Sequence, residues 1–301
     1  MAAPVASPAQ RYLEQLSDSD LALLASASGV GARSEESPGY LRGHPELIEP
    51  ALRSPGAFEQ LFPTEPNVGL TTAASPFLLF AVAVHRGVAD LSTATFVAEP
   101  FAGWRRIPIF DSASLQAHFD DPARRLFAVE HLASYTRVAS GPVWVRSERG
   151  TTRRVRYSEV DPTRLAALVL MVDDDDKPGI YRRLGDLALL LTGVFPDWAA
   201  KTPAHPVTVE RLVRSVQVPA AGASFSVEDV APLTGASGLG GMLRVLGPHW
   251  YRLAAETTPL PPVRRVLQDA ADGFEKARRF LTLLTDRYLF PIRGRWFGVP
   301  G

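Results

Sequence analysis

The chain has 301 residues, no cysteine, and 32 basic residues against 32 acidic ones, so its formal net charge is zero. This length is enough to bury a sizeable core and favours a division into two parts. The balanced charge gives no overall attraction to nucleic acid or membranes, and the lack of cysteine excludes disulfides, thiolate metal sites and a cysteine nucleophile. The first residues lack the features of a signal peptide, and no apolar run approaches the roughly 18 residues of a membrane span, so we expect a cytoplasmic protein.

Residues 1–158 are expected to form a mainly helical N-terminal part with one small β-hairpin. The clearest helix start in this part is Ser75, a typical N-cap residue, followed by Pro76, which suits the first position of a helix. This pair predicts an apolar helix that ends near Leu91. The stretch 28–62 before it is rich in glycine and proline and leaves room only for short helical turns.

Four further elements are expected in the rest of this part. An extended-looking piece is followed by a short helix, then by a longer helix that begins after Asp121, and then by two strands joined by a glycine-containing turn. In chain order these elements span residues 92–110, 112–119, 123–138, and 143–146 together with 152–157.

The order of elements in the segment 75–157 resembles that of a winged-helix DNA-binding domain, in which the third helix enters the major groove and the hairpin lies along the backbone. The hairpin is rich in arginine, which suits contacts with phosphates. The resemblance therefore implies a candidate nucleic-acid-binding set: Arg146, Arg149, Arg153, Arg154 and Arg156. The longer helix is rather apolar for one that reads base edges, so a structural hairpin with a solvated arginine face remains the alternative.

Residues 159–301 are expected to form an antiparallel helical bundle, interrupted by an irregular insertion over 196–238 that is rich in proline, glycine and serine. The strongest pattern is an apolar stripe with alternating steps of four and three residues, which predicts one long helix over 261–290. Its members are Val263, Leu267, Ala270, Phe274, Ala277, Leu281, Leu284 and Tyr288. Shorter stripes over 180–198 and 239–257 predict two neighbouring helices, and the first is apolar almost all round, so it is expected at the centre.

Small residues add two expectations about how these helices pack. Gly185, Ala188 and Thr192 form a strip along the expected central helix, where a neighbouring helix can approach closely. Gly247 and Pro248 lie in the middle of the 239–257 stripe, and a proline in a helix interior predicts a kink there.

Asp186 is an unusual residue, because it places a charge inside the most apolar helix of the chain. A buried carboxylate needs a partner, and Arg182 lies one helical turn before it. One interpretation is a structural ion pair that fixes the register of the bundle. The other is a ligand-binding or catalytic carboxylate, since acids with perturbed pKa values concentrate at functional sites.

No familiar catalytic or metal-binding motif supports the catalytic interpretation. The chain has no His-Glu-x-x-His zinc motif, no Gly-x-Ser-x-Gly nucleophile elbow and no phosphate-binding Gly-Lys-Ser/Thr loop. The acidic run 173–176 lacks the ligand pattern of a calcium loop, because a lysine and a proline follow it directly. We therefore expect no cofactor and no metal, and we expect the acidic run to be a solvated loop between helices.

Three functions remain as hypotheses. The first is a non-catalytic cytoplasmic binding or regulatory protein that acts through a protein partner or through self-association of its bundle. The second is a DNA-binding transcriptional regulator that uses 75–157 on DNA and the bundle for dimerisation or ligand sensing. The third is a helical enzyme of unknown reaction with its site around Asp186. The binding protein predicts an exposed apolar patch. The DNA-binding regulator predicts a salt-dependent affinity for DNA that needs the hairpin arginines. The enzyme predicts a pocket in which no arginine pairs with Asp186.

Overall fold

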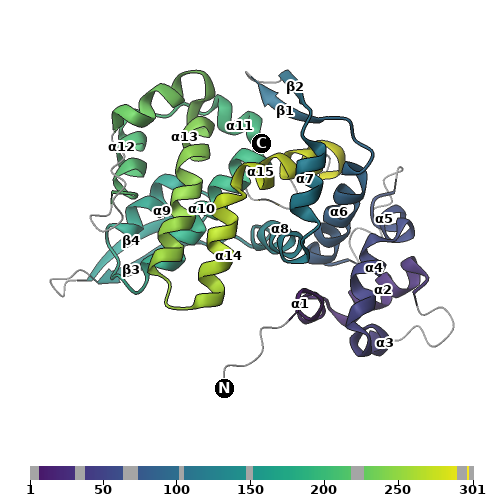
Figure 1. The fold of residues 1–301 in the computed structure, drawn as a ribbon. Helices are drawn as coiled ribbons and strands as arrows, with labels where there is room; N and C mark the ends of the chain where they lie inside the picture. The colour runs from purple at the N-terminus through teal and green to yellow at the C-terminus, as the bar shows by residue number, and fades with distance from the viewer. Residues whose placement is uncertain are drawn as a thin grey trace. The chain divides into compact units, whose positions relative to one another are not determined.

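The computed structural model describes residues 7–30, 38–63, 74–101, 105–146, 152–217, 227–289 and 297. The described chain is mainly helical, with two small antiparallel two-stranded sheets and with C-terminal helices that pack together, which confirms the predicted fold class (Figure 1). Two compact units are present. Unit 1 contains Met1–Val97, Ile109–Thr136 and Leu283–Phe297, and unit 2 contains Ala98–Pro108, Arg137–Thr282 and Gly298–Gly301.

Unit 1 is built around one apolar helix. Its helical elements are α1 (Pro8–Gln15), α2 (Asp18–Ser28), α3 (Pro38–Gly43), the short turn η1 (Pro45–Leu47), α4 (Ile48–Arg53), α5 (Pro55–Leu61), α6 (Pro76–Leu91), α7 (Ser112–Phe119), α8 (Pro122–Ser134) and the π-helical η2 (Thr285–Leu289). Helices α4, α5, α7 and α8 pack against α6. Every residue from Phe77 to His85 is buried, so α6 is the core of this unit. The Ser75 hydroxyl accepts the N–H of Leu78 at 3.2 Å and Pro76 opens the helix, as predicted.

Two short antiparallel pairs make up the strands. Strand β3 (Ser140–Arg146) pairs with β4 (Thr152–Ser158), which confirms the predicted hairpin. Strand β1 (Val97–Phe101) pairs with β2 (Arg105–Ile109), so the extended-looking piece forms a second two-stranded sheet that the sequence pattern did not distinguish. The elements of the winged-helix-like segment are divided: helices α6, α7 and α8 belong to unit 1, and the hairpin β3–β4 belongs to unit 2.

Unit 2 is a set of helices packed around α10. Its helices are α9 (Pro162–Val169), α10 (Lys177–Gly193), α11 (Pro196–Lys201), α12 (Pro206–Arg214), α13 (Val227–Thr257), α14 (Pro261–Asp272) and α15 (Phe274–Leu284), whose last two residues belong to unit 1. All residues from Leu184 to Gly193 are buried, which confirms the predicted central position of this helix. Helix α13 packs against α10, α11 and α14, and α14 runs beside it in Figure 1.

Three details of the predicted bundle are wrong. The helix predicted over 261–290 is two helices, because Gly273, a weak helix former, takes a non-helical conformation between α14 and α15. The stretch 196–238 is not an irregular insertion in its described part, which contains α11, α12 and the start of α13. The non-helical residue of α13 is Gly238 rather than Gly247 or Pro248, and its φ of 52° is one that glycine adopts without strain.

The small-residue strip on α10 is where α13 approaches it, as predicted. A Cβ added at Gly185 would lie 2.8 Å from the ring of Tyr251. A Cβ added at Gly247 would lie 2.5 Å from the ring of Phe274 and 3.1 Å from the Cβ of Ala188. Glycine at these positions therefore allows aromatic rings to pack directly against the helix backbone.

We expect Gly185→Ala to destabilise the protein by about 2 kcal/mol. The new methyl group displaces the ring of Tyr251 and weakens the hydrogen bond that its hydroxyl donates to Asp186. Overpacking and the weaker hydrogen bond together cost more than the roughly 1 kcal/mol gained in helix propensity. The matched control is Gly179→Ala in the same helix, where nothing lies within 4 Å of the added methyl group, so a small gain in stability is expected. Urea unfolding measures both free energies, and an equal effect of the two substitutions would contradict the close packing.

Candidate functional site

The hairpin β3–β4 exposes an aromatic ring beside two arginines. Trp144 lies opposite Arg154 and Pro142 lies opposite Arg156, so these four residues share one face of the hairpin. The Trp144 side chain is 70% exposed, and Arg154 and Arg156 are exposed as well. Neither arginine has an ion-pair partner in the described part of the chain, so this face presents two positive charges, of which that of Arg154 lies directly opposite the indole.

The structure describes only part of the other predicted hairpin arginines. Arg149 lies outside the described residues, and so do the side chains of Arg146 and Arg153. The backbone register pairs Arg146 with Thr152 and Arg153 with Val145.

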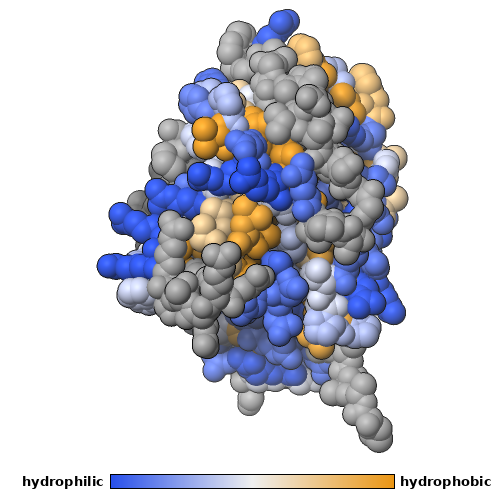
Figure 2. All heavy atoms as spheres, turned by 90° about the vertical axis from the view of Figure 1, so that its left-hand side faces the viewer, coloured by the Kyte–Doolittle hydropathy of each residue, from blue (hydrophilic) through white to orange (hydrophobic). Residues whose placement is uncertain are grey.

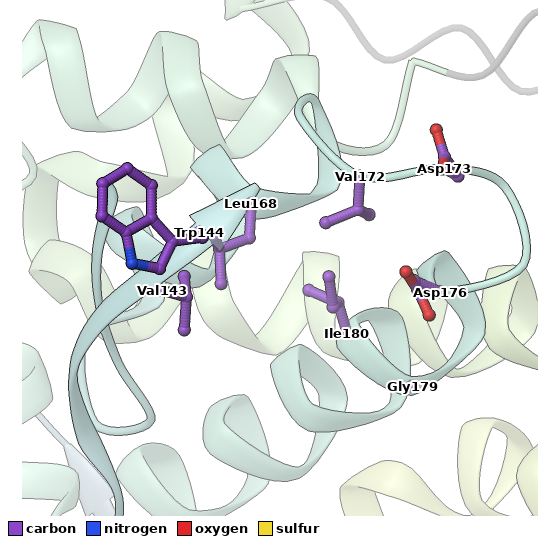
Figure 3. Close-up of a pocket in the computed structure, with 8 residues that line it drawn as sticks. All are labelled: Val143, Trp144, Leu168, Val172, Asp173, Asp176, Gly179 and Ile180. Atoms are coloured by element: carbon purple, nitrogen blue, oxygen red, sulfur yellow. The ribbon is translucent and has the colours of Figure 1, made fainter. Parts of the chain in front are cut away.

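An open apolar groove of about 490 Å³ begins beside Trp144 (Figure 3). It lies between strand β3, the end of α9 with the turn that follows, and the first residues of α10. The lining residues are Val143, Trp144, Leu168, Val172, Asp173, Asp176, Gly179 and Ile180. In Figure 3 the side chains of Leu168, Val172 and Ile180 point into a shared space, and the two aspartates lie at the end away from Trp144.

The acidic end of the groove is the turn between α9 and α10. All four aspartates of the run 173–176 are exposed, as predicted for a solvated loop. The backbone N–H of Asp176 donates to the carbonyl of Asp173 at 3.1 Å, which closes the turn. Asp174 pairs with Lys177 at 2.5 Å, whereas Asp173 and Asp176 have no cationic partner among the described residues.

Asp186 lies at the contact between α10 and α13, away from the residues of the groove. The Tyr251 hydroxyl donates to its Oδ1 at 2.7 Å, and the Nε of Arg182 lies 3.8 Å from Oδ2. Burial raises the pKa of Asp186, while the charge of Arg182 and the hydrogen bond from Tyr251 oppose that rise. This geometry fits the structural interpretation of the pair, with Tyr251 as a partner that the sequence did not indicate.

A buried ion cluster in unit 2 has no counterpart in the sequence predictions. The side chains of Arg278 and Glu99 are only 3% and 9% exposed and are hydrogen-bonded to each other. Arg279 donates to the same carboxylate at 2.8 Å, and Glu275 accepts from Arg278 and Arg244 at 3.0 Å each. Burial alone raises the pKa of Glu275, but the charges of Arg278 and Arg244 outweigh it and hold that pKa below its usual range. The cluster ties β1 to α13 and α15.

On the face drawn in Figure 2, the apolar side chains that are coloured form small patches rather than one continuous area. Figure 2 shows the side on which α12, β3 and β4 lie in Figure 1, and hydrophobic patches there alternate with hydrophilic residues. The groove beside the hairpin is thus a local feature of unit 2.

Within the described ranges, no group of three or more histidine, aspartate or glutamate side chains is arranged to hold a metal ion. None of the described helices is both long and apolar enough to cross a membrane. Comparison of the chain with protein-family models, with curated proteins and with solved structures gives no match.

Proposed function

We propose that the protein is a non-catalytic binding protein that holds a segment of a partner protein in the groove of unit 2. The observation that supports this proposal most directly is the apolar groove with Trp144 exposed at its edge. A largely exposed tryptophan beside an apolar hollow is typical of an interaction surface, since tryptophan supplies a large contact area and is enriched among the residues that dominate binding energy. Leu170, in the turn after α9, is 50% exposed and adds to the apolar surface there.

The size of the groove also suits a peptide segment. Ligand pockets generally measure about 300–1,000 Å³, and the groove falls in that range. Its apolar residues come from a strand, a helix end and a helix start, so the wall facing the partner is backed by regular structure. A partner segment that places apolar side chains over the half-buried Val172 and Ile180 removes apolar surface from water on both molecules.

The test is selection of random 16-residue peptides displayed on phage against the full chain, followed by affinity measurements on synthetic copies. We expect the selected peptides to lose at least about tenfold in affinity for Trp144→Ala, because an interfacial tryptophan commonly contributes 2 kcal/mol or more. Val207→Ala is the matched control, since Val207 is an exposed apolar residue of α12 that does not line the groove. Failure to select any peptide, or equal binding to Trp144→Ala and wild type, would contradict the proposal.

The exposed arginine face of the hairpin favours a second candidate, a DNA-binding regulator that uses β3–β4 on the phosphate backbone. Its support is that Arg154 and Arg156 are exposed and without acidic partners in the described structure.

The second candidate predicts salt-dependent binding that depends on these two arginines. For labelled duplex DNA, the double variant Arg154→Gln/Arg156→Gln is expected to reduce the slope of log affinity against log salt by about 2 between about 50 and 200 mM, one for each phosphate contact. Arg211→Gln/Arg265→Gln removes the same charge from exposed positions elsewhere in unit 2 and is expected to leave the slope unchanged. Absence of DNA binding, or equal losses in both variants, eliminates this candidate.

A further inference from the structure

We infer that the occupant of the groove is a peptide segment in which apolar side chains lie next to a lysine or an arginine. This inference rests on the proposed partner-binding function and specifies the chemistry of the partner. It is carried by the distribution of charge along the groove, whose middle is apolar and whose end at the α9–α10 turn is acidic (Figure 3).

The acidic end is available to a partner. Asp173 and Asp176 line the groove and are exposed, and the nearby positive charge of Lys177 is bound to Asp174. These two carboxylates at the end of an apolar surface can therefore bind a cationic group of a partner. A peptide with a lysine or arginine at that point places its charge beside them while its apolar side chains cover Val172 and Ile180.

The hairpin face that carries Trp144 has the opposite charge, although its arginines do not line the groove. Arg154 lies directly across from Trp144 on the neighbouring strand, and Arg156 follows on the same face. A cationic group is attracted at the aspartate end and repelled at the hairpin end, so the groove favours one direction of the bound segment. The charges thus select and orient the segment, while the apolar surface and Trp144 supply most of the affinity.

The experiment uses the same random-peptide library on the full-length wild type and on Asp173→Asn/Asp176→Asn. Peptides selected on wild type are expected to carry lysine or arginine beside apolar residues and to lose about tenfold in affinity for the double variant. Synthetic copies with glutamine in place of the basic residues are expected to bind both proteins equally, which isolates the charge interaction as a double-mutant cycle. Glu210→Gln/Glu256→Gln removes the same charge from exposed positions of unit 2 outside the groove and is expected to have no effect.

The outcomes separate the inference from the function on which it rests. Selected peptides that lack basic residues, bind the asparagine variant as tightly as wild type and still need Trp144 overturn the charge inference and leave the groove as a docking site. Peptides that bind Trp144→Ala as well as wild type, or the absence of any selected peptide, overturn both. Displacement of the peptides by a labelled oligonucleotide that needs Arg154 and Arg156 shows instead that the hairpin face binds nucleic acid.

Discussion

Replacing Arg278 by methionine is expected to lower the free energy of unfolding by about 3 kcal/mol. Removal of one partner of a buried ion pair typically costs about 3–5 kcal/mol, because the remaining charge is left buried without compensation. Here the remaining charge is Glu99, whose side chain is 9% exposed. Arg279 still donates to its Oε2 at 2.8 Å, which places the expected loss at the lower end of that range.

Two comparisons test this explanation. Arg252→Ala breaks a pair with Asp272 in which both side chains are at least 44% exposed, so a loss below about 1 kcal/mol is expected. Combining Arg278→Met with Glu99→Leu removes both buried charges, and the double variant is expected to be more stable than Arg278→Met alone. Urea unfolding followed by circular dichroism gives all three values. If Arg278→Met lowers the free energy of unfolding no more than Arg252→Ala does, burial of the Arg278–Glu99 pair does not determine its contribution to stability.

Nothing in the sequence indicated this cluster, and the reason is the distance along the chain. Glu99 and Arg278 are 179 residues apart. Glu99 belongs to a short strand, and Arg278 occupies a position between members of the apolar stripe that is usually taken for solvent. Local periodicity reports which side of a helix is apolar, but it does not report which charged residue a distant strand will bring to the other side.

Predictions succeeded where one local signal decided the outcome. Ser75 and Pro76 start α6 because capping and the fixed φ of proline act within a single turn. Gly185 marks the approach of α13 because only a residue without a side chain leaves room for the ring of Tyr251. The break at Gly273 was missed because the apolar stripe continues in register across it, so α14 and α15 together carry the pattern of one helix.

The groove could not be predicted from the sequence, because local patterns do not show which apolar residues are exposed in the folded chain. The high density of arginines in the hairpin is visible in the sequence. In contrast, Leu168, Val172 and Ile180 are ordinary apolar residues of the kind that pack inside a helical bundle. The role of Val172 and Ile180 depends on their partial exposure, which follows from the position of the hairpin beside α9. Trp144 gave no earlier signal either, since an inward- and an outward-facing tryptophan on a strand have the same sequence neighbours.

The buried His85 of unit 1 is expected to make the protein unstable in acid. His85 is 1% exposed, and neither of its ring nitrogens has a hydrogen-bond partner among the described residues. Its ring centroid lies 5.8 Å from that of Tyr12. Burial, with smaller contributions from the charges of Arg125 and Arg53, lowers the pKa of His85 from 6.5 to about 3. Between those values the unfolded chain binds a proton that the folded chain does not, so stability is present above the unfolded pKa and is lost as the pH falls.

His85→Leu is expected to remove this part of the acid sensitivity. From pH 7 to pH 4 the wild type should lose about 3 kcal/mol more than the variant, because each pH unit below the unfolded pKa costs about 1.4 kcal/mol. At pH 7 the variant should be at least as stable as wild type, since leucine has a similar volume and leaves no buried nitrogen without a partner. The exposed His205, changed to glutamine, serves as the control and should leave the pH profile unchanged. Parallel pH profiles for wild type and His85→Leu would show that protonation of His85 does not drive acid unfolding.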